Sequence, residues 1–130
     1  MKNILFITKS KMACLALQGT LAESCIIEWA RSYNESNEIM NNDKNIDLLL
    51  IEHATKDEDI IIYLNKINKE KTNTLIMIST RAEYLTDNIL KCLLKTNNFV
   101  GLIDTLIYEE NKIKEAVHKA LNKQYKLVRG

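Results

Sequence analysis

Glu52 is the residue of this sequence that is best placed to do chemistry. It ends the apolar run Ile46–Glu52, and His53 follows it directly. The apolar residues of this run do not alternate with polar ones, which is typical of a central parallel strand buried on both faces. In open α/β sheets, ligands and catalysis collect beyond the carboxyl ends of such strands. His53 would be a base or a phosphohistidine if it reached the site, but a residue in this position is more often a loop or packing histidine.

Polar residues also follow three further apolar segments. Ile4–Ile7, Thr74–Ile78 and Phe99–Ile103 are each predicted to form a strand. Directly after them, or at their ends, stand Thr8, Lys9, Ser79, Thr80, Asp104 and Thr105. Because the carboxyl ends of parallel strands meet at one edge of a sheet, we expect these side chains to lie near Glu52.

The segments between these strands have helical patterns. Met12–Glu23 predicts an amphipathic helix, Cys25–Ala30 a further strand, and Tyr33–Lys44 a short helix followed by a loop. Strands and helices therefore alternate from the N-terminus onward, which favours parallel strands joined by helical crossovers.

Two capping-box spacings mark the expected starts of later helices. They lie at Thr55–Glu58 and Thr80–Glu83. The last helix is expected to begin near Tyr108, to end within Gln124–Gly130, and to bury Ile113, Val117, Ala120 and Leu121. The alternation predicts an α/β fold, a five-stranded parallel, doubly wound three-layer sandwich.

Length and composition indicate one cytoplasmic domain. The 130 residues favour a domain over 1–122 and a tail or linker start over 123–130. Cys14, Cys25 and Cys92 are predicted to be reduced core thiols without metal-ligand spacing. No apolar run is long enough to cross a membrane, and a net charge of +1 argues against a dedicated nucleic-acid binder. Three glycines cannot form a phosphate-binding loop, which disfavours a nucleotide-binding enzyme.

The order of elements and three strand sequences resemble the receiver domain of two-component response regulators, a flavodoxin-like or CheY-like fold. The three are Asp-Leu-Leu-Leu-Ile-Glu at 47–52, Leu-Ile-Met-Ile-Ser at 75–79 and Phe-Val-Gly-Leu-Ile at 99–103. The resemblance covers essentially the whole chain. It implies phosphorelay signalling in a bacterial cytoplasm and no enzymatic activity of the domain itself.

The resemblance also implies which residues occupy the family's signature positions. The phosphoacceptor aspartate corresponds to Glu52, the Mg²⁺-binding acidic pair to Thr8 and Lys9, and the phosphoryl-binding hydroxyl and lysine to Ser79 and Thr105. Only Ser79 has the family's residue type. Hard divalent ions need several oxygen ligands, so we expect Mg²⁺ binding and ordinary phosphotransfer to be lost.

A Lys9–Glu52 ion pair with Ser79 as a hydrogen-bond partner would hold this site in one state. The alternative is a solvated surface pair that contributes at most about 1 kcal/mol. The family's switch aromatic corresponds to Leu102, which puts the usual rotamer switch in doubt, and Trp29 is predicted to be a core residue.

These correspondences predict a pseudo-receiver that acts through protein–protein contact without phosphorylation. The face formed by the fourth and fifth helices and the fifth strand, about Glu83–Gln124, would bind a protein partner or a second copy. A DNA-binding output domain is a further partner if the chain is part of a longer protein. Receiver phosphorylation with an unusual acceptor or metal arrangement is a second possibility.

A third possibility is a phosphocarrier. Ile4–Leu17 and Ile103–Ala120 resemble the ends of the lactose/cellobiose enzyme IIB of the sugar phosphotransferase system. In that family a nucleophilic cysteine follows the first strand. Its position here is Thr8, and the position of the loop glycine is Lys11.

Overall fold

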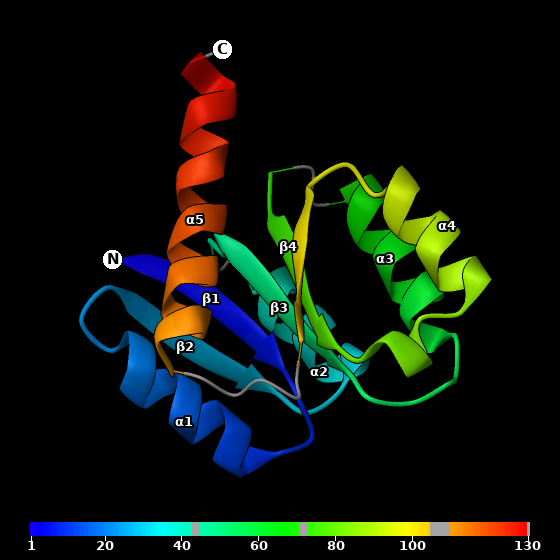
Figure 1. Ribbon diagram of the computed structural model, residues 1–130, viewed down its shortest axis with the longest axis horizontal. Helices are drawn as coiled ribbons and strands as arrows, with labels where there is room; N and C mark the ends of the chain where they lie inside the picture. The colour runs from blue at the N-terminus through cyan, green and yellow to red at the C-terminus, as the bar shows by residue number, and fades with distance from the viewer. Residues whose placement is uncertain (43–44, 71–72, 105–109, 130) are drawn as a thin grey trace.

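A single parallel sheet with strand order β2-β1-β3-β4-β5 forms the centre of the molecule (Figure 1). The computed structural model describes residues 1–42, 45–70, 73–104 and 110–129. The strands are β1 (Lys2–Ile7), β2 (Cys25–Ala30), β3 (Leu48–His53), β4 (Leu75–Thr80) and β5 (Phe99–Asp104). All four pairings between neighbouring strands are parallel, so the predicted doubly wound fold is confirmed.

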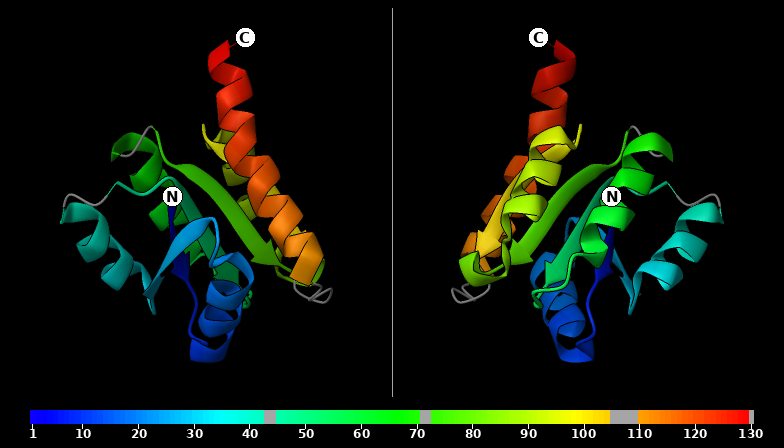
Figure 2. Two further views of the ribbon diagram at one scale, coloured as in Figure 1. Left: turned by 90° about the vertical axis from the view of Figure 1, so that its left-hand side faces the viewer. Right: turned by 90° about the vertical axis from the view of Figure 1, so that its right-hand side faces the viewer.

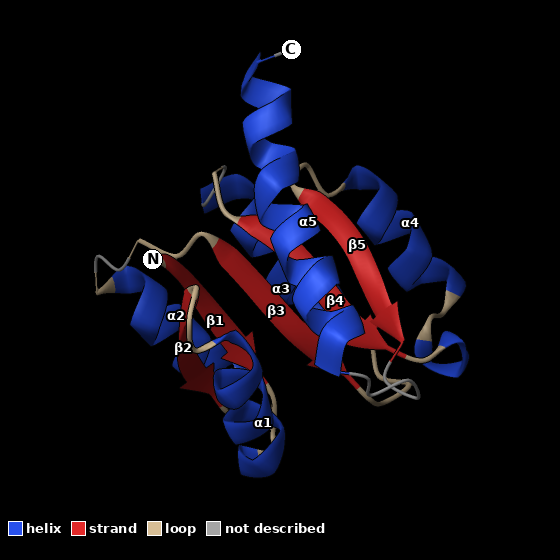
Figure 3. Cartoon of the chain, turned by 60° about the vertical axis from the view of Figure 1, so that its left-hand side comes forward, coloured by secondary structure: helices blue, strands red, loops and turns tan. Residues whose placement is uncertain are grey.

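Helices cover both faces of this sheet (Figure 2 and Figure 3). One face carries α1 (Lys11–Leu21) and α5 (Glu110–Arg129). The other carries α2 (Tyr33–Asn41), α3 (Asp59–Glu70) and α4 (Asp87–Lys95). The chain thus has the predicted three layers and two separate apolar cores.

The central strands β1 and β3 supply side chains to both cores. Leu5 and Leu49 pack with α2, α3 and α4, whereas Ile4 and Leu48 pack with α1 and α5. Successive side chains of a strand point to opposite faces, and here both faces are covered. This explains why these strands are apolar throughout and do not alternate.

The three cysteines are free and buried, as the sequence predicted. None of the described helices combines the length and the apolar character that a membrane-spanning helix needs.

Both predicted capping boxes are wrong. The Thr55 hydroxyl donates to Asp57 Oδ2, and Asp57 Oδ1 accepts from the amide of Asp59, so α3 begins later than predicted. The Thr80 hydroxyl donates to the carbonyl oxygen of His53 at 2.7 Å. β4 therefore continues through Thr80, because pairing with β3 outweighs the local capping preference.

Thr86 is the residue that caps α4. A short 3₁₀ helix, η1 (Ala82–Tyr84), precedes it. Thr86 Oγ1 accepts from the amide of Ile89 at 3.2 Å and donates to Glu58 Oε2. The cap therefore joins the start of α4 to the segment that leads into α3.

The last helix agrees with the sequence pattern over most of its described length. Ile113, Val117 and Ala120 are buried as predicted, while Leu121 is only partly buried. The expected start near Tyr108 lies outside the described residues. The segment that we expected to be a tail or linker start continues α5 as helix to Arg129, past the end of the sheet (Figure 1).

Thr86→Ala should lower the free energy of unfolding by about 1 kcal/mol, since the Ile89 amide loses its acceptor. Thr86→Ser should retain most of the stability. Chemical denaturation of both variants checks this. Thr55→Ala is the matched control, and a loss there as large as that of Thr86→Ala would contradict the assigned cap.

Candidate functional site

The ends of β1, β3 and β4 bring the predicted site residues to one edge of the sheet. Glu52 lies opposite Ser79 in the β3–β4 ladder, and Thr80 lies opposite Asp104 in the β4–β5 ladder. Thr8 follows β1 and contacts Glu52 directly. Thr105 lies outside the described residues.

Thr8 is the most connected residue of this edge. Its hydroxyl donates to Glu52 Oε1 at 2.9 Å and accepts from the amide of Ser10 at 3.1 Å. Its carbonyl oxygen accepts from Trp29 Nε1 at 2.8 Å, and its amide donates to the carbonyl oxygen of Ala30 at 3.0 Å. With 3 % of its surface exposed, Thr8 joins β1 to β2, to β3 and to the start of α1.

The expected ion pair between Lys9 and Glu52 is wrong. Among the residues that the structure describes, no ion pair joins the two, and Glu52 accepts from Thr8 instead. Thr8 continues the β1–β2 ladder through its amide. Lys9 follows Thr8 at a bend of the chain and lines the same cavity as Glu52 without pairing with it.

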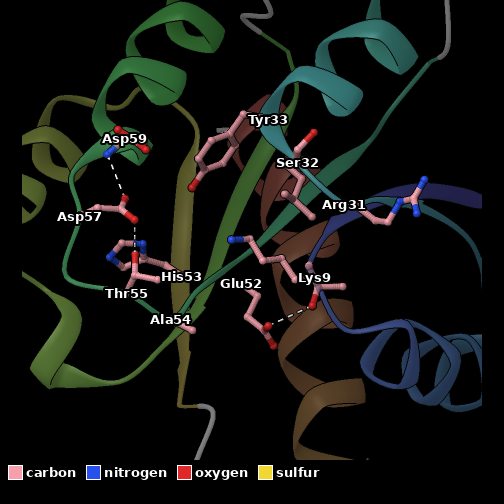
Figure 4. A pocket seen from close by; sticks show the side chains of 12 residues that line it. Lys9, Arg31, Ser32, Tyr33, Glu52, His53, Ala54, Thr55, Asp57 and Asp59 are labelled. Carbon is pink, nitrogen blue, oxygen red and sulfur yellow. Dashed lines mark hydrogen bonds between the residues drawn. The ribbon is translucent and has the colours of Figure 1, made fainter.

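Glu52 separates two cavities. On the side of α1 and α5, Glu52, Ser79 and Asp104 line a small cavity of about 80 Å³. On the side of α2 and α3, a cavity of about 350 Å³ extends from Glu52 and Lys9 to Asp59 (Figure 4). We call this second one the α2–α3 cavity.

His53 is the packing histidine that the sequence predicted. It is 3 % exposed, and its Nε2 lies 3.0 Å from the carbonyl oxygen of Tyr84. Its ring meets that of Tyr84 edge to face. A ring nitrogen that is engaged in this way is unavailable as a base or as a phosphoacceptor.

The sequence analysis missed the contribution of β2 to this edge. Arg31, Ser32 and Tyr33 follow β2 and line the α2–α3 cavity. The rule that selected the other strand ends would have selected them too. Trp29, predicted to be core, is only partly buried, and its indole nitrogen holds Thr8 in place.

The donor set around Glu52 does not fit Mg²⁺. The contact of Glu52 is a neutral hydroxyl, and the neighbouring Lys9 is a cation. Within the described ranges, no three His, Cys, Asp or Glu side chains gather as metal ligands. Mg²⁺ takes near-octahedral oxygen coordination, and the two carboxylates of the small cavity, Glu52 and Asp104, lack the third acidic ligand that a protein site of this kind needs.

Comparison with known proteins yields similarity of structure alone. No protein-family model matches the sequence, and no curated protein matches it. A CheY-like receiver domain protein from Methanospirillum hungatei JF-1 superposes with a TM-score of 0.79 at 19% identity, covering 97% of this chain and 98% of the other. The chain has the receiver fold.

Other solved receivers agree with this assignment of the fold. A response regulator receiver domain from Clostridium thermocellum gives a TM-score of 0.78 at 18% identity, over 98% of this chain and 99% of that one. A LuxR family DNA-binding response regulator from Silicibacter pomeroyi gives 0.75 at 13% identity, over 95% and 93%. At such identities the receiver fold is shared, and the function must be argued from the site.

Thr8→Val should lower the free energy of unfolding by about 1–2 kcal/mol, because the half-buried Glu52 carboxylate and the Ser10 amide both lose their partner. Thr8→Ser keeps the hydroxyl and should stay close to the parent protein. Urea titration of both variants at neutral pH measures the difference. A valine variant as stable as the serine variant would show that the Thr8–Glu52 bond contributes nothing.

Proposed function

We propose that this chain is a receiver-like module of two-component signalling that acts through protein contacts without being phosphorylated. The observation that carries the proposal is the hydrogen bond from the buried Thr8 hydroxyl to Glu52. Thr8 and Glu52 stand where the resemblance to receivers implies a Mg²⁺ ligand and the phosphoacceptor. In this chain the two side chains form a hydrogen bond with each other.

The local charges also oppose phosphorylation. A phosphoryl group on Glu52 would add a dianion that a metal or a fixed cation must offset. Lys9 extends into the α2–α3 cavity with its amine turned toward Tyr33 and forms no ion pair with Glu52 within the described residues (Figure 4). The position of the family's lysine is Thr105 in the sequence. The receiver fold generally serves signalling without catalysis, so we assign no enzymatic activity to the chain.

The phosphocarrier alternative is less well supported. It requires a nucleophilic cysteine after β1, and that position is Thr8. The nearest cysteine, Cys14, lies inside α1 and is 2 % exposed. Burial raises the pKa of the Cys14 thiol, which disfavours the reactive thiolate.

The proposed output surface is the face formed by α4, β5 and α5. Leu94 and Leu90 on α4 are 88 % and 41 % exposed, and Leu102 on β5 is 48 % exposed. Leu102 lies opposite Ile78 in the ladder, and Ile78 faces the core that α4 covers. These three leucines therefore give α4 and its side of β5 an apolar surface, which typically marks a protein contact.

We propose a second copy of this chain as the first partner to test. An isologous contact would cover the leucines of both copies at once. An output domain of the kind named for the Silicibacter pomeroyi regulator is the other candidate, should the chain belong to a longer protein.

The decisive experiment is intact-mass spectrometry after incubation with Mg²⁺ and acetyl phosphate. The chain should gain no phosphoryl group. The positive control is the triple variant Thr8→Asp, Lys9→Asp, Glu52→Asp, which restores three acidic positions of the family and should be labelled. An adduct on the parent chain would overturn the proposal, and failure to label the variant would count against the receiver correspondence itself.

Leu94→Glu should abolish self-association, because it places a charge at the centre of the proposed contact. Sedimentation velocity over a range of concentrations measures the association. Ile62→Glu on α3 is the matched control, since Ile62 is also an exposed apolar residue, at 74 %, and lies on another surface. A parent chain that stays monomeric throughout would exclude the second copy as the partner.

A further inference from the structure

The α2–α3 cavity is lined by aspartates on one side, and one cation, Lys9, extends into it; the guanidinium of Arg31 is turned away from the space (Figure 4). Asp57 and Asp59 come from the segment that enters α3, whereas Arg31 and Ser32 come from the segment that enters α2 (Figure 4). Lys9 reaches into the space between them (Figure 4). At about 350 Å³, the cavity is at the lower end of the range for small-molecule sites.

The charges of the cavity are not all neutralised by one another. Arg31 pairs with Glu35 at 3.5 Å and lies over the ring of Trp29. Across the described ranges, neither Lys9 nor the carboxylate of Asp59 takes part in an ion pair. The hydrogen bond from Thr55 lowers the pKa of the Asp57 carboxyl, and the charge of Lys9 adds a smaller effect in the same direction. Lys9 and Asp59 face the same space without being joined by an ion pair.

The aromatic ring of Tyr33 also lines this cavity. The ring of Tyr33 stacks on that of Tyr63 with 4.5 Å between centroids, which fixes its orientation. Burial raises the pKa of the Tyr33 hydroxyl, and the nearby charges of Asp57 and Asp59 add to this effect. The negative charges of Asp57 and Asp59 are therefore felt at the Tyr33 side of the cavity.

We propose that the α2–α3 cavity binds a small zwitterion of the amino-acid class. Its carboxylate would lie against Lys9, its ammonium group against Asp59, and its side chain along Tyr33. A simple anion would meet Glu52, Asp57 and Asp59, and a simple amine would place a second cation beside Lys9. A molecule that carries both an ammonium and a carboxylate group can pair with Asp59 and with Lys9 at once.

Such a ligand would be the input of the module in place of a phosphoryl group. This role rests on the proposed function, whereas the binding site itself does not. Binding is measured without any phosphorylation step, so its failure is distinguishable from a failure of the proposed function.

The test is a screen of the twenty free L-amino acids at millimolar concentration, using thermal shift and the fluorescence of Trp29. Trp29 is the only tryptophan of the sequence. It does not line the cavity, but its ring contacts Arg31, which does, and its indole nitrogen donates to Thr8, so its fluorescence responds to changes at this edge. At least one amino acid should raise the melting temperature and change the fluorescence saturably. Its N-acetyl derivative and its carboxamide, which each lack one charge, should bind much more weakly.

Two variants locate the site. Lys9→Gln and Asp59→Asn should each weaken binding by about tenfold or more, the effect expected for a lost charge-assisted hydrogen bond. The matched controls are Lys11→Gln at the start of α1 and Asp87→Asn in the first turn of α4, which lie outside the cavity lining. Circular dichroism confirms that all four variants are folded.

Three results would overturn the proposal. The first is that no amino acid of the panel binds. The second is that binding is unchanged in Lys9→Gln and Asp59→Asn. The third is that the carboxamide binds as tightly as the free amino acid, which would identify a site for simple amines.

Discussion

Burial of β1 and β3 on both faces is the constraint on which the rest of this structure depends. These two strands lie at the centre of the sheet, and their side chains fill the core under α1 and α5 as well as the core under α2, α3 and α4. Each Leu or Ile that is fully buried there contributes about 1.5–3 kcal/mol to stability. Strands buried in this way leave no room for polar side chains, which are therefore found where the strands end. Thr8 and Glu52 meet at that edge for this reason.

The Thr8–Glu52 bond gives this edge a property that ion-dependent sites lack. A site built on several carboxylates needs a cation to offset their repulsion, so its geometry depends on what is bound. Here a neutral hydroxyl donates to the single carboxylate, and Trp29 and Ala30 hold the backbone of Thr8. The arrangement needs no bound ion, which supports our proposal of a module that does not require phosphorylation.

Two hydrogen bonds join the segment that leads into α3 to the start of α4. Glu58 lies between Asp57 and Asp59, and its carboxylate accepts from the Thr86 hydroxyl and from Asn88 Nδ2 at the start of α4. Thr86 and Asn88 stand at the N-terminus of the helix that carries Leu90 and Leu94. Two polar contacts thus lie between the segment that borders the proposed ligand site and the helix that carries the proposed output surface.

The fold, and the edge of the sheet where the polar residues gather, could be predicted from the amino-acid sequence alone. Apolar strands such as Leu48–His53, helical spacing and the order of elements each reflect local burial, and all of them agree with one topology. Only the tertiary structure decided which polar groups pair: Thr8 and not Lys9 contacts Glu52, Thr86 and not Thr80 caps α4, and the end of β2 contributes to the cavity. These pairings depend on the register between neighbouring strands and on the direction in which each side chain points. Hydrophobic periodicity fixes the face of a strand, but it does not specify hydrogen-bond partners between segments that are far apart in the sequence.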